Sequence, residues 1–188
     1  MNKEKMGVVE SIKDSIVGVI KGAGDIVNAM VKMISGMVNN LAKETGKTGV
    51  ALIELTQDMI NATITGIVET GKNLEDGVKG LVIGILKGSK AVGEEAFGAI
   101  GALASKIIKT TAKAGGDVVG ATKGLLKGVI HSTKDTGVDA EKAVSVAATE
   151  AVKAAYEVSS EVGDKVKKAA TGTIDGITVV IKEPLIKK

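Results

Sequence analysis

The side chains that could perform acid–base, nucleophilic or metal chemistry are few in this chain and do not cluster. His131 is the only histidine, and the chain contains no cysteine. It therefore lacks the nucleophile–base pairs of covalent catalysis and the imidazole or thiolate sets that hold transition metals. The 22 acidic residues alternate with lysine, which is typical of solvated carboxylates rather than a catalytic pair in a cleft. The sequence predicts a protein that is not an enzyme and has no catalytic, cofactor-binding or metal site.

The basic residues and aromatic residues argue against a nucleic-acid partner. All 25 basic residues are lysine, the net charge is +3, and Phe97 and Tyr156 are the only aromatic side chains. Bidentate recognition of phosphates and bases uses arginine, and single-strand binding uses aromatic stacking. We expect no nucleic-acid partner and no small-molecule substrate.

Two glycine series with i, i+4 spacing stand out along the chain. They are not a phosphate-binding loop, because no strand precedes them and no Gly-Lys-Ser/Thr follows. One interpretation is that helix backbones approach each other closely at these glycines. The other, which we prefer at this point, is that they lower helicity so that the chain orders only on a surface. The series are Gly80, Gly84, Gly88 and Gly120, Gly124, Gly128.

An eleven-residue hydrophobic rhythm runs from Val8 to residue 183 without a break in phase. With Val8 at offset 0, the offsets 0, 1, 4, 7 and 8 are apolar or small through sixteen repeats. Of these 80 positions, only Glu75 and Glu141 are charged. Eleven residues fill three helical turns at about 3.67 residues per turn, so the five offsets form one stripe roughly 130° wide on a straight helix. The rhythm predicts a single long amphipathic helical surface.

We interpret this stripe as a lipid-facing surface. It contains threonine and glycine where a bundle core favours leucine, and a modest apolar face repeated many times suits a lipid–water interface. Lysines at offset 5 flank the stripe, where their stems can lie alongside it. The predicted lipid-facing residues are Val8, Val9, Ile12, Val19, Ile20, Val27, Met30, Val31, Ile34, Leu52, Ile53, Ile60, Ile64, Ile67, Leu81, Val82, Ile85, Leu86, Phe97, Ile100, Ile107, Ile108, Val118, Val119, Leu125, Leu126, Val129, Ile130, Ile174, Ile177 and Ile181. The predicted interfacial lysines are Lys13, Lys79, Lys90, Lys123, Lys134 and Lys167.

The predicted fold class is all-α, with long amphipathic eleven-residue-repeat helices. They are either extended on a lipid surface or bent into an antiparallel helical hairpin or bundle. The divisions are an N-terminal lead (1–7), a continuous repeat region (8–183) and a C-terminal tail (184–188). Bends, if present, are expected where glycine, asparagine and threonine gather: 39–40, 44–49, 69–73, 114–117 and 135–137. The unbroken phase argues against real loops, because a loop need not keep an eleven-residue step.

No secretory signal and no uncharged apolar stretch of spanning length is visible. We therefore expect a cytoplasmic protein that is peripheral at lipid surfaces.

Part of the repeat region resembles known lipid-surface proteins. The pairs Thr122-Lys123 and Thr133-Lys134 lie eleven residues apart, as in perilipin repeats. The segment 134–138 (Lys-Asp-Thr-Gly-Val) is similar to the Lys-Thr-Lys-Glu-Gly-Val box of synucleins with one residue inserted. The chain thus resembles the amphipathic repeats of perilipins and synucleins, which implies reversible coating of lipid droplets or vesicles. Late-embryogenesis-abundant repeats are a weaker match, because they are more hydrophilic than a mean hydropathy of +0.24.

Three functions remain open on the sequence alone. The first is a non-enzymatic coat that stabilises a lipid droplet, granule or membrane interface. The second is a structural helical assembly, a bundle or filament built through buried stripes, with the chain as a possible homo-oligomer. The third is a stress or desiccation protectant. The expected partner is accordingly a lipid surface or a second copy of the chain.

Overall fold

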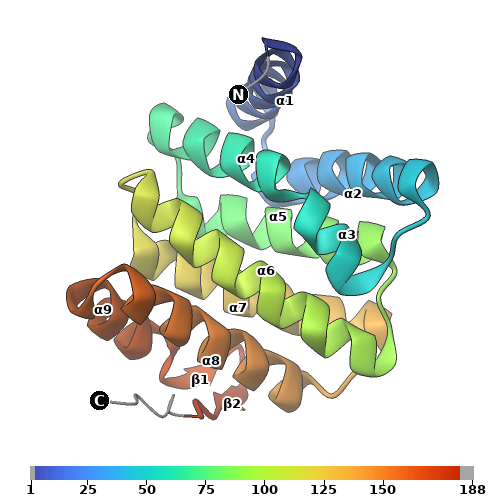
Figure 1. The fold of residues 1–188 in the computed structure, drawn as a ribbon. Coiled ribbons are helices and arrows are strands. Elements are labelled where there is room, and N and C mark those ends of the chain that lie inside the picture. The colour runs from blue at the N-terminus through green and yellow to red at the C-terminus, as the bar shows by residue number, and fades with distance from the viewer. Residues whose placement is uncertain (1–2, 183–188) are drawn as a thin grey trace.

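The chain folds into a stack of helices that ends in a small β-hairpin (Figure 1). The computed structural model describes the backbone of residues 3–182 and the side chains of residues 10–182. The side chains of Val8 and Val9, the lead residues 1–2 and the predicted tail 184–188 lie outside the described residues. The elements are α1 (Lys3–Gly22), α2 (Ile26–Thr45), α3 (Gly49–Leu55), α4 (Gln57–Thr70), α5 (Leu74–Ser89), α6 (Gly93–Lys113), α7 (Val118–Thr136), α8 (Ala140–Val158), α9 (Ser160–Ala170), β1 (Gly172–Ile174) and β2 (Ile177–Val179). The all-α prediction, in its bent form, is confirmed.

The helices from α2 onward alternate between two layers. In one layer α2, α5 and α7 lie side by side, and in the other α3–α4, α6 and α8 do so (Figure 1). Neighbours within a layer run parallel, because Gly80, Gly84 and Gly88 of α5 meet successively later residues of α2. When α3 and α4 are counted as one broken helix, each helix packs beside the next-but-one helix along the chain. Helical-repeat proteins pack in the same way.

The links between these helices repeat every 44 residues. Gly46 and Gly49, around the α2–α3 link, both have positive φ, and so do Lys90 and Gly93 at the α5–α6 link. Asn73 caps the start of α5, and Asp117 caps the start of α7, each accepting a backbone N–H. The repeating unit of the fold is therefore a pair of helices with its two turns, four eleven-residue steps long.

This unit corrects the prediction of a continuous helical region over 8–183. Within the rhythm, a glycine recurs every 22 residues. In the structure each of these glycines has a left-handed backbone and marks a turn, so none of them lies on a lipid-facing stripe. These glycines are Gly49, Gly71, Gly93, Gly115 and Gly137. A helix and its turn together occupy about two eleven-residue steps, so the turns keep the phase of the rhythm.

The glycine series allow the helix backbones of one layer to pack closely. A Cβ on Gly84 would lie 2.7 Å from Cβ of Ile34 in α2, and one on Gly124 would lie 2.2 Å from the carbonyl oxygen of Glu75 in α5. Such distances leave room only for hydrogen at Cα. The structure therefore bears out the close-approach interpretation for these glycines.

The end of the repeat region also differs from the prediction. Helix α9 ends at Ala170, and β1 and β2 pair antiparallel with Ile174 opposite Ile177. Asp175 and Gly176 between them both have positive φ, as a tight two-residue hairpin turn requires. The apolar rhythm continues through this segment, so the sequence predicts helix where the structure has strands.

One turn position carries strain that a substitution can relieve. Lys90 ends α5 with φ of 52°, whereas the equivalent position 44 residues earlier is Gly46. A left-handed backbone is costly for any residue with a Cβ, so Lys90→Gly should stabilise the fold by about 0.5–1 kcal/mol. Gly46→Ala should destabilise it by a similar amount. Urea denaturation of the two variants checks this, and equal shifts of the same sign would contradict it.

Candidate functional site

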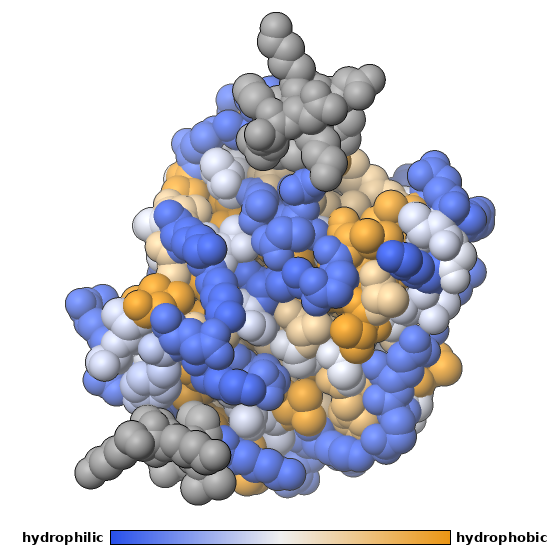
Figure 2. Space-filling view, in the orientation of Figure 1, coloured by the Kyte–Doolittle hydropathy of each residue, from blue (hydrophilic) through white to orange (hydrophobic). Residues whose placement is uncertain are grey.

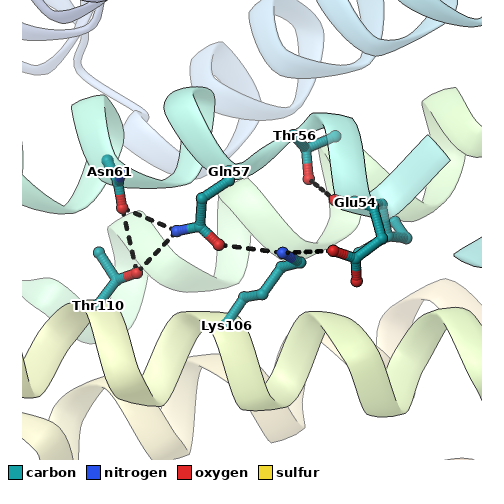
Figure 3. Close-up of polar contacts among 7 residues, drawn as sticks. Glu54, Thr56, Gln57, Asn61, Lys106 and Thr110 are labelled. Carbon is teal, nitrogen blue, oxygen red and sulfur yellow. Dashed lines mark hydrogen bonds and ion pairs between the residues drawn. The ribbon is translucent and has the colours of Figure 1, made fainter. Parts of the chain in front are cut away.

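A polar groove lies between α3–α4 and α6, beside the side-chain contacts drawn in Figure 3. Its volume is about 490 Å³. The lining residues are Glu54, Gln57, Asn61, Ala102, Ser105, Lys106, Lys109, Thr110 and Lys113. The groove lies where the helix opposite α6 is broken into α3 and α4 at Thr56.

Thr56 breaks that helix from inside the core. Its side chain is fully buried, and its hydroxyl donates to the carbonyl of Ile53 at 2.8 Å. The backbone N–H of Thr56 also bonds Ile53 at 3.1 Å, an i−3 pattern that tightens the turn. A threonine hydroxyl that bonds its own helix commonly bends it. The bend places Gln57 and Asn61 at the start of α4 opposite α6.

Gln57 is the centre of the hydrogen-bond network in Figure 3. Its amide Nε2 donates to Asn61 Oδ1 at 2.8 Å and to Thr110 Oγ1 at 3.2 Å. Its Oε1 accepts from Lys106 Nζ at 3.1 Å. The Thr110 hydroxyl then donates to Asn61 Oδ1 at 3.2 Å. The network therefore ties α4 to α6 with its main donors and acceptors already paired.

The lysines of α6 that line the groove are also paired in part. Lys106 Nζ lies 3.1 Å from Glu54 Oε2, and Lys109 Nζ lies 2.5 Å from Glu157 Oε2 on α8. Lys106, Lys109 and Lys113 follow one another along one edge of the groove. Ion pairs and amide bonds of this kind hold neighbouring helices in register. The paired side chains of the groove thus position α3–α4 and α8 against α6.

A second cavity of about 440 Å³ lies between α8 and the chain that follows β2. The backbone N–H of Val180 donates to Ser145 Oγ, and that of Lys182 donates to Thr149 Oγ1, at 3.0 and 3.1 Å. These bonds fasten an extended segment along the outer face of α8. At the rim, Lys142 pairs with Glu94 and lies 4.2 Å from the ring centre of Phe97.

The predicted lipid-facing stripe lies largely inside the protein. Nineteen of its residues are buried in the core: Ile20, Met30, Ile34, Leu52, Ile53, Ile60, Ile64, Ile67, Leu81, Val82, Ile85, Leu86, Ile100, Ile107, Ile108, Val118, Leu125, Leu126 and Val129. Ten more are half-buried: Ile12, Val19, Val27, Val31, Phe97, Val119, Ile130, Ile174, Ile177 and Ile181. On the face seen in Figure 2, hydrophilic side chains separate the apolar patches. In this fold, contact between the stripe and lipid requires the helices to separate.

Threonines on the stripe can lie in a protein core when their hydroxyls donate hydrogen bonds within their own helix. Thr122 and Thr133 of α7 are buried, and their hydroxyls donate to carbonyls one turn earlier at 2.6 and 2.7 Å. A hydroxyl satisfied within its own helix can be buried at little cost. Thr122 and Thr133 therefore do not favour a lipid surface over a packed core, whereas Thr111 is buried with no hydrogen-bond partner for its hydroxyl.

The predicted interfacial lysines are spread over the molecule. Lys13 lies on α1, 2.8 Å from Glu69 of α4, and Lys90 occupies the strained turn. Lys123 and Lys134 are exposed on α7, while Lys79 of α5 and Lys167 of α9 are half-buried. They do not form one continuous border in the folded chain. His131 is exposed on α7, away from the groove residues.

Two charged pairs between helices and one within α9 predict how stability depends on pH. The hydrogen bond and charge of Lys109 lower the pKa of Glu157, and Lys165 lowers that of Glu161 in the same way. The hydrogen bond and charge of Glu75 raise the pKa of Lys127. Carboxylates with lowered pKa stabilise the fold above their ordinary pKa and lose this effect as the pH falls. A lysine with raised pKa stabilises it below its ordinary pKa and loses this effect as the pH rises.

We therefore expect the melting temperature to be level from about pH 5 to pH 9 and to fall outside that window. Thermal melts across pH test this. Glu157→Gln should make the acid limb shallower, and an unchanged limb would show that this pair contributes nothing to it.

Three further observations apply to the described residues. No group of three or more histidine, cysteine or carboxylate side chains is placed to hold a metal ion there. No helix in that part of the chain has the length and apolarity needed to cross a bilayer. The larger exposed apolar side chains there, Val50, Leu55, Val92, Val158 and Val180, lie in loops or near helix ends.

Compared with known proteins, the chain matches no family model, no curated protein and no solved structure.

Proposed function

We propose that this chain is a non-enzymatic structural protein whose folded helical stack serves as a scaffold for assembly. The observation that carries the proposal is that the apolar stripes are buried within the folded chain. Each stripe packs against the neighbouring helices of the same chain, with glycines at the closest contacts. A protein built in this way has its apolar surface already covered in water, and its outer surface presents charged side chains to partners.

Ion pairs between helices of one layer support the same proposal. Glu75 of α5 pairs with Lys127 of α7 at 2.7 Å, and Glu54 of α3 pairs with Lys106 of α6 at 3.1 Å. Exposed pairs contribute little stability individually. Their repetition between parallel neighbours favours one register of the stack, which suits a scaffold more than a chain that orders on demand.

A lipid coat is a second candidate function. It differs from the coat expected from the sequence, because the folded helices would have to separate before the stripe meets lipid. The buried core is aliphatic, and its two neighbouring rings, Phe97 and Tyr156, are only half-buried. A lipid interface offers aliphatic side chains an environment similar to such a core. The coat would then form by separation of helices at the surface.

Circular dichroism distinguishes the two functions. The purified protein is measured in buffer and then with neutral vesicles, anionic vesicles and an oil emulsion. The scaffold predicts high helicity in buffer, a cooperative thermal melt and no change with lipid. Coil in buffer that becomes helix on lipid would overturn the scaffold. High helicity in buffer with loss of the cooperative melt on lipid would favour a coat that opens.

A further inference from the structure

Helix α1 stands outside the repeating stack. It packs mainly on α4 and makes a smaller contact with α2. Figure 1 shows α1 nearly end-on, whereas α4 runs across the view, so α1 crosses α4 steeply instead of lying beside it. The helices from α2 to α8 each have a parallel neighbour within their layer. The contact of α1 with the rest of the chain is therefore largely one helix crossing.

That crossing is centred on Gly66 of α4. A Cβ there would lie 3.3 Å from Val17 and 3.6 Å from Ile16, so the missing side chain makes the notch that receives α1. One turn further along α4, Glu69 pairs with Lys13 at 2.8 Å. Ile16 and Ile20 of α1 are 0% and 1% exposed. The apolar ridge of α1 thus depends on this notch for its burial.

The link between α1 and α2 differs from the glycine turns that end α2 and α4. It is formed by the last residue of α1, Gly22, together with Ala23, Gly24 and Asp25, and a Cβ on either glycine would meet nothing within 4 Å. Neither glycine has positive φ, in contrast to the turn glycines Gly46 and Gly71. The link therefore lacks the left-handed cap that ends α2 and α4.

Helix α2 does not need α1 for its own start. Asp25 caps it by accepting the backbone N–H of Asn28 at 3.0 Å, and the far side of α2 packs on the glycines of α5. If α1 leaves, α2 keeps its cap and its neighbour, while the notch on α4 and the ridge of α1 are both exposed to water. An identical α1 from a second copy restores every lost contact. Exchange of an identical element is a low-cost route to self-association.

We propose that two copies of this chain associate by exchanging α1, so that the α1 ridge of each copy occupies the Gly66 notch of the other. This inference rests on the scaffold function and names its partner as a second copy. The link 22–25 acts as the hinge. The stack from α2 onward keeps its structure in the exchanged form.

The absence of cysteine makes the exchange directly testable. One chain carries Val17→Cys and a second carries Gly66→Cys. The two are mixed in denaturant, refolded together at high concentration and oxidised with oxidised glutathione. The diagnostic product is the mixed disulfide between the two variants, identified by mass spectrometry of the linked peptides, because it requires α1 of one copy to reach α4 of the other. The matched control replaces Val17→Cys by Ser15→Cys, an exposed position on the opposite side of α1.

We expect at least about tenfold more cross-linked dimer from the Val17 pair than from the control. The double variant Val17→Cys/Gly66→Cys, refolded in dilute solution, should close within one chain and so verifies the geometry. Closure in the double variant without excess dimer in the mixture would overturn the exchange. Failure of the double variant to close would also overturn it, because α1 would then not occupy the notch.

The hinge is tested by Gly22→Ala/Gly24→Ala, which fits the open space and favours one continuous helix through the link. Two such substitutions should raise the exchanged dimer about tenfold or more, and no increase would exclude the hinge. A cooperative melt with no exchange would leave the scaffold standing and remove only this inference. A non-cooperative melt would instead remove the scaffold itself, so the two failures are distinct.

Discussion

Gly124→Ala is expected to destabilise the fold by about 3 kcal/mol, at the upper end of what overpacking costs. The new Cβ would lie 2.2 Å from the carbonyl oxygen of Glu75 and 3.0 Å from its carbon. These are backbone atoms of α5, so no side-chain rotation can relieve the contact, and α5 and α7 must move apart. Equilibrium denaturation in urea measures the loss.

Gly36→Ala is the matched control, because Gly36 also lies inside a helix but a Cβ there would meet nothing within 4 Å. It should stabilise the protein by about 1 kcal/mol through helix propensity alone. Opposite signs for the two variants follow only if the helices pack as a stack. If the glycines served merely to keep the free chain flexible, both substitutions would raise helicity, and a gain in stability at Gly124 would contradict the packing.

The sequence predicts much of this fold because the same physical constraint repeats along it. Burial on one face of each helix requires the apolar stripe, and the stripe gives the helical class. The glycine-rich segments 44–49, 69–73, 114–117 and 135–137 all contain turns in the structure. Asn39-Asn40, by contrast, lies within α2, and the break at Thr56 was not anticipated, because a bend made by one buried hydroxyl leaves no glycine or proline signal.

The phase of the apolar stripe does not show whether the stripe faces lipid or a protein core. An eleven-residue step preserves the direction of a stripe on a straight helix, and a helix-plus-turn unit of about 22 residues preserves it equally well. Only the left-handed backbone at Gly71 and Gly137 distinguishes a turn from a stripe position, and glycine is small enough for both. The groove between α4 and α6 was missed for a related reason. Gln57, Asn61 and Lys106 are ordinary polar-face residues until the fold brings them together.

Deletion of residues 72–115 is expected to leave a shorter protein that still folds cooperatively. The deletion removes one 44-residue unit and joins Gly71 to Gly116, which recreates the Gly-Gly-Asp link at 115–117. It brings α7 beside α2 with Gly120, Gly124 and Gly128 available for close contact, and α8 beside α4. The unfolding transition in urea should remain single, with a smaller slope because less surface is exposed on unfolding.

Deletion of residues 97–107 tests the same principle from the other side. It removes a single eleven-residue step, so the phase of the stripe is unchanged. Only ten residues of α6 (Gly93–Lys113) remain, and they must connect two turns that the complete helix separates in the native chain. The faces of α3 and α8 that contact α6 would lose much of their cover, and we expect cooperative unfolding to disappear. A stripe lying on lipid would tolerate both deletions, since both keep its phase. If both deletion variants unfold with equal cooperativity, the helix pair is not the repeating unit. If only the variant lacking 72–115 folds cooperatively, the eleven-residue rhythm encodes a helix pair of 44 residues.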